Sequence, residues 1–93
     1  MLTLKLSKQA EIFLDTIPIK HAKQIVGKID KLIEDPNSVQ SKQLEGFPQY
    51  RRIKSGEYRI IYRVDNGILT LLVVLIGKRN DGQVYKDFVK SVS

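Results

Sequence analysis

The chain has 93 residues, and its 16 Lys and Arg against 10 Asp and Glu give a formal net charge of +6 at pH 7. This length suits a single domain, residues 1–93, and 42% hydrophobic with 28% charged residues is typical of a globular chain. No Cys is present, which excludes disulfides and thiolate sites, and one His is too few for a histidine metal centre. The longest apolar stretch, residues 68–76, is too short for a transmembrane helix. We therefore expect a basic cytoplasmic domain without metal, cofactor or membrane contact, whose partner is an anion or polyanion.

The chain begins with a predicted strand and a predicted helix. Leu and polar residues alternate over residues 2–6, which is typical of a half-buried strand. Ser7 is a suitable N-cap, and apolar residues at helical spacing predict a helix over about residues 8–16. Pro18 ends this helix and, because proline is favoured in a first turn, opens the next one.

The clearest helical pattern of the chain follows. Apolar residues recur at helical spacing from Ala22 to Ile33, so we expect a long amphipathic helix that ends at Asp35-Pro36. His21 would lie on the first turn of this helix, exposed to solvent. Residues 37–49 are mostly polar, and we interpret them as a connection to the second half of the chain.

The second half of the chain predicts β-strands. We expect strands at about residues 50–54, 57–65 and 68–77, joined by two-residue loops at Ser55-Gly56 and Asn66-Gly67. Asn-Gly is a strong hairpin signal, because both central positions of the tight turn need positive φ. Apolar residues between Val84 and Val89 then predict a short C-terminal helix or turn.

The predicted order is therefore β-α-α-β-β-β followed by a short C-terminal helix or turn. Helices that precede a run of strands favour an α+β fold, with the two N-terminal helices on one face of a mostly antiparallel sheet. The positive charge is concentrated in the strand-rich half, because residues 50–93 hold nine basic and four acidic residues and all five Arg. We expect the working surface of the protein in this half.

The two predicted loops decide which side chains share a face of the sheet. A loop at Ser55-Gly56 pairs Arg52 with Arg59, and a loop at Asn66-Gly67 pairs Arg59 with Val74. One face then carries four cations and an apolar strip, namely Arg52, Lys54, Arg59, Lys78, Ile61, Leu72, Val74 and Ile76. The opposite face, which should carry the two helices, has Tyr58, Ile60, Tyr62, Leu71, Val73 and Leu75.

The predicted Arg52–Arg59 pair indicates an anion site. Like charges directly opposite each other destabilise a sheet, unless they are well solvated or an anion lies between them. Lys54 and Lys78 add charge to the same face, and Arg79 follows the end of the last predicted strand. We therefore expect this face to bind a phosphate or a polynucleotide.

Tyr85 admits two interpretations. It could pack as a buried aromatic beside Val84 and Phe88, or it could present its hydroxyl at the rim of the cationic face. A phenol can act as a base near neutral pH only where neighbouring cations favour its charged form, because burial alone has the opposite effect. Composition does not decide between the two interpretations.

Five motifs follow one another along the chain: Gln43-Leu44-Glu45-Gly46, Tyr50-Arg51-Arg52-Ile53-Lys54, Tyr58-Arg59-Ile60-Ile61-Tyr62, Gly77-Lys78-Arg79 and Val84-Tyr85. In this order and spacing they resemble the RelE family of bacterial and archaeal toxin–antitoxin modules. The likeness covers nearly the whole chain, including its length, element order and basic charge. It implies a small cytosolic mRNA endonuclease that acts in the ribosomal A site and needs no metal.

The resemblance also implies roles for individual residues. Tyr85 would be the base that activates an RNA 2′-hydroxyl for attack on the adjacent phosphorus, leaving a 2′,3′-cyclic phosphate. Arg79 would lie near the leaving 5′-oxygen as acid or stabiliser. Arg52, Lys54 and Arg59 would hold the charge that develops on the phosphate, although Arg stands at position 52 where the family more often has Lys. We expect further contacts to RNA from Arg51, Lys78 and Lys86.

The partners implied by the resemblance are mRNA, the rRNA of the ribosome, and a cognate antitoxin that binds the basic face and the apolar strip. Two alternatives stay open. The related ParE branch shares the scaffold and targets DNA gyrase without the ribonuclease residues, and a non-catalytic basic module would bind RNA or a partner protein. The presence of Arg59, Arg79 and Tyr85 together favours the nuclease. The C-terminal segment from Val84 to Phe88 is a second candidate to cover the apolar strip.

Overall fold

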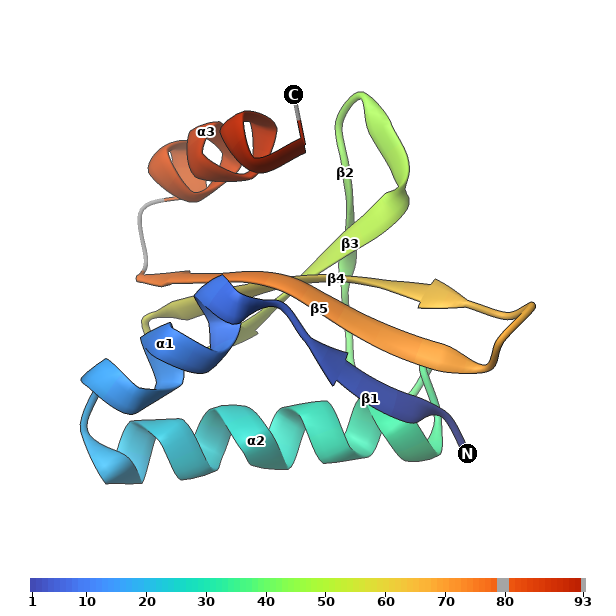
Figure 1. Cartoon of the computed structure of the whole chain (residues 1–93), viewed down its shortest axis with the longest axis horizontal. Coiled ribbons are helices and arrows are strands. Elements are labelled where there is room, and N and C mark those ends of the chain that lie inside the picture. The colour runs from blue at the N-terminus through green and yellow to red at the C-terminus, as the bar shows by residue number, and fades with distance from the viewer. Residues whose placement is uncertain (79–80, 93) are drawn as a thin grey trace.

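The computed structural model describes residues 1–78 and 81–92, and it shows an α+β fold in which helices cover both faces of one five-stranded sheet (Figure 1). Along the chain the elements are β1 (Thr3–Leu6), α1 (Lys8–Thr16), α2 (Ile19–Glu34), β2 (Lys42–Leu44), β3 (Phe47–Ser55), β4 (Tyr58–Asp65), β5 (Thr70–Lys78) and α3 (Asp81–Val92). The strand order is β1-β5-β4-β3-β2, with β1 parallel to β5 and the other neighbours antiparallel. The predicted fold class and the mostly antiparallel sheet are confirmed.

Helices α1 and α2 begin and end where local sequence signals predict. The Ser7 hydroxyl oxygen accepts a hydrogen bond from the Ala10 amide at 3.1 Å, so Ser7 caps α1. Pro18 precedes the first residue of α2 and Asp35 follows its last. The Asp35 carboxylate accepts a hydrogen bond from the Asn37 amide at 2.9 Å, which turns the chain away from the helix.

Side chains at the start of α1 bind the backbone of β5. The Ser7 hydroxyl donates to the Val74 carbonyl at 2.8 Å. The Gln9 amide group donates to the Ile76 carbonyl at 2.9 Å and accepts from the Ile76 amide at 3.0 Å. Strand β1 ends at Leu6 and does not reach Ile76. The Gln9 side chain takes its place there, because it satisfies both backbone groups of Ile76. These bonds fix α1 against the sheet.

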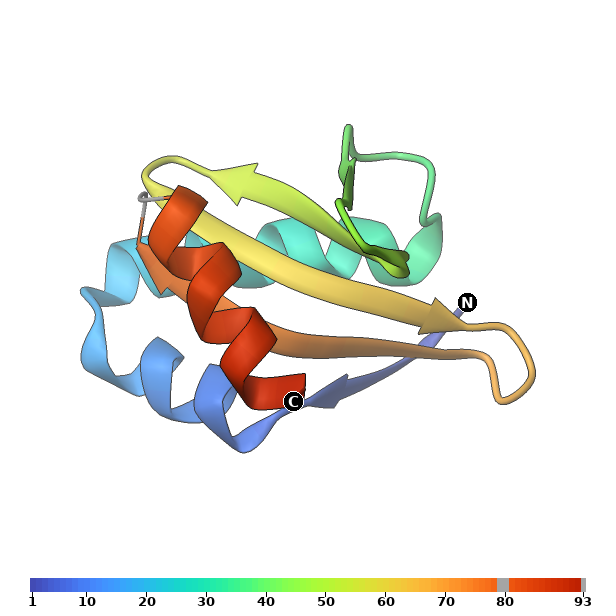
Figure 2. The same cartoon turned by 90° about the horizontal axis from the view of Figure 1, so that it is seen from above.

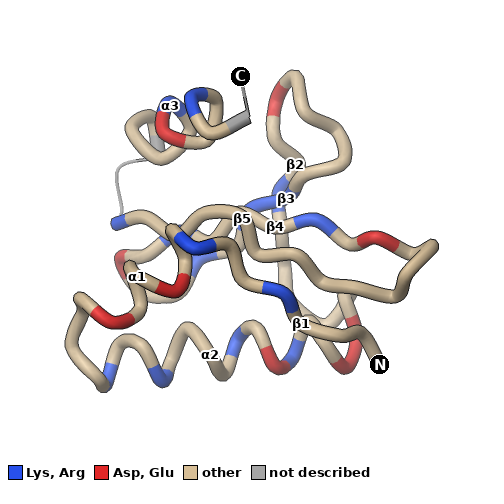
Figure 3. The backbone as a smooth tube through the Cα atoms, in the orientation of Figure 1, with Lys and Arg blue, Asp and Glu red and all other residues tan. Residues whose placement is uncertain are grey.

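The two faces of the sheet have separate cores. Helices α1 and α2 cover one face, whose buried residues are Ala10, Ile25, Ile29, Leu32, Ile53, Tyr58, Ile60, Tyr62, Leu71, Val73 and Ile76. Helix α3 crosses the strands on the other face (Figure 2), over Leu44, Ile61 and Leu75, with its own Val84 and Phe88 buried. The predicted C-terminal segment is therefore a 12-residue helix, and this segment, one of the two candidates to cover the apolar strip, packs over Ile61 and Val74 of it. Helix α2 also carries four Lys residues along its length (Figure 3).

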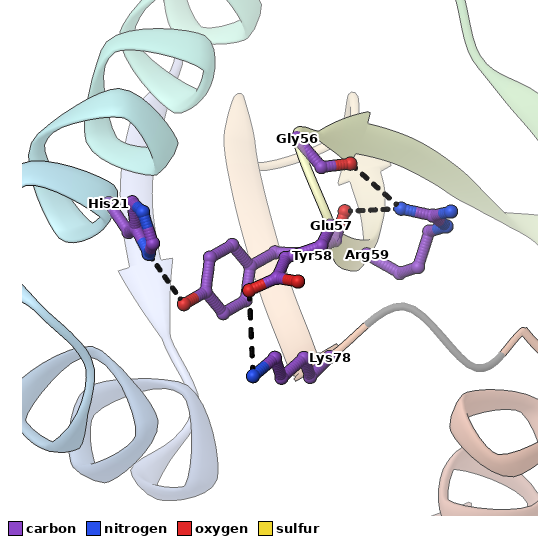
Figure 4. Close-up of polar contacts among 6 residues, drawn as sticks. All are labelled: His21, Gly56, Glu57, Tyr58, Arg59 and Lys78. Carbon is purple, nitrogen blue, oxygen red and sulfur yellow. Dashed lines mark hydrogen bonds and ion pairs between the residues drawn. The ribbon is translucent and has the colours of Figure 1, made fainter.

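His21 is not simply solvated, which corrects the prediction. Its Nδ1 lies 2.8 Å from the Tyr58 hydroxyl, and the two rings are 5.3 Å apart between centroids (Figure 4). Tyr58 is buried, and its ring also packs edge-on against Phe13. The hydroxyl of a buried tyrosine needs a partner, and α2 supplies one through His21.

We expect Tyr58→Phe to lower the free energy of unfolding by about 1 kcal/mol, because it removes this hydrogen bond and keeps the ring. Urea unfolding measures the change. In a double-mutant cycle with His21→Ala, the loss caused by Tyr58→Phe should disappear. An equal loss in both backgrounds would contradict the assignment, and Tyr50→Phe, on the opposite face, is the matched control.

Strand β2 was not predicted. The connection expected over residues 37–49 contains the three-residue strand Lys42–Leu44 and the first residues of β3. Lys42 pairs with Arg52 and Gln43 with Arg51, and the register shifts before Leu44 pairs with Phe47. A strand this short, with two polar residues of three, has no recognisable alternation, so only its pairing with β3 defines it.

Both predicted hairpin loops are wrong by one or two residues. In the β3–β4 hairpin Ser55 pairs with Tyr58, so the loop is Gly56-Glu57, with Gly56 at φ +58°. In the β4–β5 hairpin Asp65 pairs with Thr70, and the loop spans residues 66–69. There the Asp65 carboxylate accepts a hydrogen bond from the Gly67 amide at 3.0 Å, which stabilises a wider turn than Asn-Gly alone would form.

A β-bulge in β5 moves side chains between the two faces. Ile61 pairs with Leu75 whereas Tyr62 pairs with Val73, which leaves Val74 as an extra residue. Beyond the bulge the alternation of β5 is inverted relative to the prediction. Leu75 therefore packs under α3, and Ile76 packs with the helices α1 and α2. The sequence placed Leu75 on the face of α1 and α2 and Ile76 on the cationic face, and the bulge makes both predictions wrong.

Candidate functional site

Two like-charged pairs lie directly opposite each other on three neighbouring strands. Lys42 of β2 is paired with Arg52 of β3, and Lys54 of β3 is paired with Arg59 of β4. These four residues are called the cation face below. Like charges in such pairs oppose sheet formation, and an anion bound over them would offset that repulsion. The cation face is therefore the first candidate for a phosphate site.

The predicted Arg52–Arg59 pair is wrong, but the prediction that Arg52, Lys54 and Arg59 share one face is confirmed. Moving a hairpin loop by one residue changes every cross-strand pairing by two, and side chains two residues apart share a face. Arg52 therefore pairs with Ile61, while Lys54 is the residue opposite Arg59. Arg52, Lys54 and Arg59 remain on the face that α3 covers in part.

Lys42 is the member of the cation face that sequence reasoning missed. It lies in β2, whose existence the sequence did not indicate, and its pairing with Arg52 depends on the chain returning past β3. The only local signal is the placement of Lys42 and Leu44 two residues apart, which puts a cation and a core residue on one side of a short strand.

A hollow of about 300 Å³ brings Tyr85 close to the cation face. It is lined by Lys42, Gln43, Leu44, Glu45, Arg52, Gly82 and Tyr85. The predicted site residues Arg52 and Tyr85, which come from β3 and α3, thus border one cavity, together with Lys42. Lys54 and Arg59 lie outside this lining, farther along the same face.

Tyr85 combines the two interpretations that the sequence left open. Its ring is half-buried and packs edge-on against Phe47, with ring centroids 6.3 Å apart. Its hydroxyl donates a hydrogen bond to the Glu45 carbonyl at 2.8 Å, in the turn between β2 and β3. Gly46 in that turn has φ +80°, a conformation that favours glycine, so the turn that carries this acceptor depends on Gly46.

The position of Tyr85 also depends on how closely α3 approaches the sheet. A Cβ atom at Gly77 of β5 would lie 2.7 Å from Val84 Cγ2, so only glycine allows this approach. Val84 and Phe88 are buried beneath α3, and the Phe88 ring contacts those of Phe47 and Tyr50 at 5.1 and 4.8 Å between centroids. These contacts hold the helix that presents Tyr85.

Arg59 lies against the β3–β4 loop. Its Nη1 donates to the Gly56 carbonyl at 3.2 Å and to the Tyr58 carbonyl at 3.0 Å (Figure 4). Both acceptors are backbone carbonyl groups of the loop and of the first residue of β4. Arg59 is thus placed at the loop end of the cation face, opposite Lys54.

Lys78 does not join the cation face, which corrects the prediction. The bulge places it opposite Tyr58, whose side chain belongs to the core under α1 and α2. Its Nζ lies 3.5 Å from a Glu57 carboxylate oxygen (Figure 4), and the side chains of Lys78 and Glu57 are 61% and 36% exposed. Such a pair adds little stability.

The remaining predicted residues are scattered. Arg51 pairs with Tyr62, on the opposite face from Arg52, and its Nε donates to the Ser41 hydroxyl at 2.6 Å. Lys86 is exposed on α3. Arg79 lies outside the described residues. Within residues 1–78 and 81–92, no group of three His, Asp or Glu side chains is placed to hold a metal ion, and no helix is long and apolar enough to cross a membrane.

Comparison with known proteins identifies the family. A family model described as the ParE toxin of the type II toxin–antitoxin system parDE matches residues 4–82. The chain is 31% identical over 71 residues to the mRNA interferase toxin RelE of Escherichia coli, an alignment that covers 74% of each chain. The mRNA interferase RelE of Shigella flexneri gives the same identity and coverage.

Solved structures agree on the fold. The isolated RelE toxin of Escherichia coli superposes with a TM-score of 0.75 at 24% identity, over 100% of each chain. The toxin in the archaeal RelE–RelB complex from Pyrococcus horikoshii gives a TM-score of 0.74 at 24% identity, over 86% of this chain and 97% of that one. With a family model over most of its length and a relative above 30% identity, the chain belongs to the RelE/ParE family of toxins from type II toxin–antitoxin modules.

Proposed function

We propose that this toxin is an endoribonuclease that cleaves mRNA in the ribosomal A site and so inhibits translation. The observation that carries the proposal is the hollow that Tyr85, Arg52 and Lys42 line together, at the end of a face with two further cations. The relatives named mRNA interferase support it, because they match 74% of the chain. Relatives found in complex with RelB support a cognate antitoxin as the second partner. It would bind over the basic face and over the part of the apolar strip that α3 does not cover.

In the proposed reaction the RNA supplies its own nucleophile. The 2′-oxygen forms a bond to the adjacent phosphorus and the bond from phosphorus to the 5′-oxygen breaks, which gives a 2′,3′-cyclic phosphate and a 5′-hydroxyl. Tyr85, as phenolate, takes the proton of the 2′-hydroxyl. The leaving 5′-oxygen takes a proton from Arg79 or from water. No metal-bound water is needed, because no external nucleophile takes part.

The cation face would stabilise the transition state. The attacked phosphate gains negative charge as the 2′-oxygen bonds to it, and Arg52, Lys54 and Arg59 would bind that charge. Lys42 joins this group in our proposal, because it is paired with Arg52 and lines the same hollow as Tyr85. Arg51, Lys78 and Lys86 are outside the group, and any contact they make would be to flanking RNA.

Two side chains would change partners when RNA binds. The Tyr85 hydroxyl donates to the Glu45 carbonyl, and it must turn toward the 2′-hydroxyl to act as a base. The Arg59 guanidinium would exchange the Gly56 and Tyr58 carbonyls for phosphate oxygens, which are stronger acceptors because they are charged.

A gyrase-directed toxin is the second candidate. The ParE family model matches residues 4–82, and this match ends three residues before Tyr85. The matched part therefore contains the scaffold and the cation face but not the proposed base. A toxin of the ParE branch would use the same fold without needing Tyr85.

Purified protein added to ribosomes that carry a defined mRNA tests the two candidates. We expect cleavage within the A-site codon, seen by primer extension, with a 2′,3′-cyclic phosphate on the upstream fragment. An mRNA with a 2′-deoxy sugar at the cleaved position is the matched control, and it should stay intact. Intact mRNA together with gyrase-dependent DNA breaks in a parallel assay would support the ParE candidate instead.

A further inference from the structure

Two further hollows continue from the Tyr85 hollow around the edge of the sheet. The first, of about 440 Å³, is lined by Lys28, Val39, Gln40, Ser41, Lys42, Arg52 and Lys54, so it shares Lys42 and Arg52 with the Tyr85 hollow. The second, of about 480 Å³, is lined by Gln24, Gly27, Lys28, Lys31, Ser55 and Gly56. Shared lining residues thus connect Tyr85, on one side of the sheet, with α2 on the other.

The path exists because β2 is short. It pairs with β3 only as far as Arg52, so the edge of β3 beyond this residue has no neighbouring strand. Lys54 is exposed there, and the loop that follows brings Gly56 next to α2. Figure 3 shows Lys and Arg positions on β3 and along α2, which lie on the two sides of this edge.

The charged residues that line the two further hollows are all basic. The two further hollows are lined by four Lys and one Arg and by no acidic residue among the described part of the chain. Lys28 is half-buried between them, and no described carboxylate forms an ion pair with it. A lysine that lines two hollows and has no carboxylate partner among the described residues favours an anionic ligand.

We propose that Lys28 and Lys31 of α2 bind phosphates of the same RNA strand that is cleaved, so that the strand runs from the Tyr85 hollow over the edge of β3 to α2. This inference rests on the proposed function, because it takes RNA as the ligand of the Tyr85 hollow. Arg52 and Lys54 are two residues apart on one strand, about 7 Å, which suits neighbouring phosphates of an extended chain. Lys42 lines the Tyr85 hollow and the first further hollow, Lys54 lines only the first further hollow, and Lys28 lines both further hollows, which gives the order Lys42, Lys54, Lys28 along the path.

Binding of RNA that cannot be cleaved tests the path separately from the reaction. The probes are 2′-O-methyl oligonucleotides of four and twelve nucleotides, with affinity measured by fluorescence anisotropy over a range of salt concentrations. We expect the double variant Lys28→Ala/Lys31→Ala to bind the longer RNA about tenfold more weakly at about 0.1 M salt, and its log–log salt slope to fall by about 1.4, or 0.7 for each lost phosphate contact. Binding of the shorter RNA should change by less than about twofold, because it can occupy the Tyr85 hollow and the cation face without reaching α2.

The matched control is Lys20→Ala/Lys23→Ala, which removes the same charge from exposed positions at the other end of α2. An equal loss in this control, or unchanged binding of the longer RNA by the test variant, would overturn the inference. A loss seen only with ribosomes would assign the path to rRNA, and a loss seen only with a poly-glutamate peptide would assign it to an acidic protein; both results also overturn it. Wild-type protein that binds neither oligonucleotide would also overturn the inference, whereas cleavage on programmed ribosomes tests the proposed function separately.

Discussion

Replacing Tyr85 by Phe should lower the rate of mRNA cleavage by about 10²- to 10⁴-fold, the usual contribution of a general base. The change removes one hydroxyl and keeps the ring that packs on Phe47. The loss should appear in single-turnover cleavage by protein in excess over ribosomes, so that product release does not limit the rate. Binding to programmed ribosomes should change little, because the cations remain.

Two controls separate catalysis from support of the fold. Tyr50→Phe removes a hydroxyl from the same face of the sheet, at a residue that packs on Phe88 and does not line the Tyr85 hollow, and it should cleave at nearly the wild-type rate. The bond from Tyr85 to the Glu45 carbonyl is also lost in the test variant, at about 1 kcal/mol of stability or less. Thermal unfolding of the Tyr85→Phe variant measures this loss of stability. Cleavage within threefold of wild type would remove Tyr85 from the role of base.

The pH dependence gives an independent readout. If Tyr85 acts as the base, the rate of the chemical step should rise with pH, because only the phenolate accepts the 2′-proton. The Tyr85→Phe variant should lack that rise. A residue that only supports the β2–β3 turn would lower the rate at every pH by the same factor.

The predictable parts of the fold depend on signals within a few residues. Ser7 caps α1 through the Ala10 amide, three residues away, and Pro18 and Asp35 border α2. Each of these signals acts within one helical turn, so the sequence alone is sufficient to locate it. Strand β2 has no such signal, because its three residues become a strand only through pairing with β3.

The candidate site was predicted in part, for a geometric reason. An error of one residue in the β3–β4 loop keeps Arg52, Lys54 and Arg59 on one face, because the pairing changes by an even number. The bulge at Val74 changes the pairing of β5 by an odd number, which moves Lys78 to the other face, so the prediction for Lys78 is wrong. A bulge depends on how β5 packs under α1 and α3, and a single strand sequence does not report that packing.

Replacing Phe88 by Ala should release α3 from the sheet and abolish most cleavage without touching the cation face. Phe88 is fully buried, and it packs against Ile61 and Leu75 of the sheet and against the rings of Phe47 and Tyr50. Truncating such a residue costs about 3–5 kcal/mol. Because α3 is held to the sheet mainly by Val84 and Phe88, we expect much of this loss as undocking of the helix.

Hydrogen exchange distinguishes undocking from global unfolding. In Phe88→Ala the amides of α3 should exchange nearly as fast as those of an unfolded peptide, while those of β4 and β5 keep most of their protection. Phe88→Leu, which preserves most of the volume, should restore both protection and cleavage. Ile19→Ala is the control for side-chain truncation, since Ile19 is 74% exposed and its loss should cost less than about 0.5 kcal/mol.

Protected α3 amides together with normal cleavage in Phe88→Ala would contradict the view that this contact positions Tyr85. Fast exchange in α3 with normal cleavage would show instead that Tyr85 acts without a docked helix.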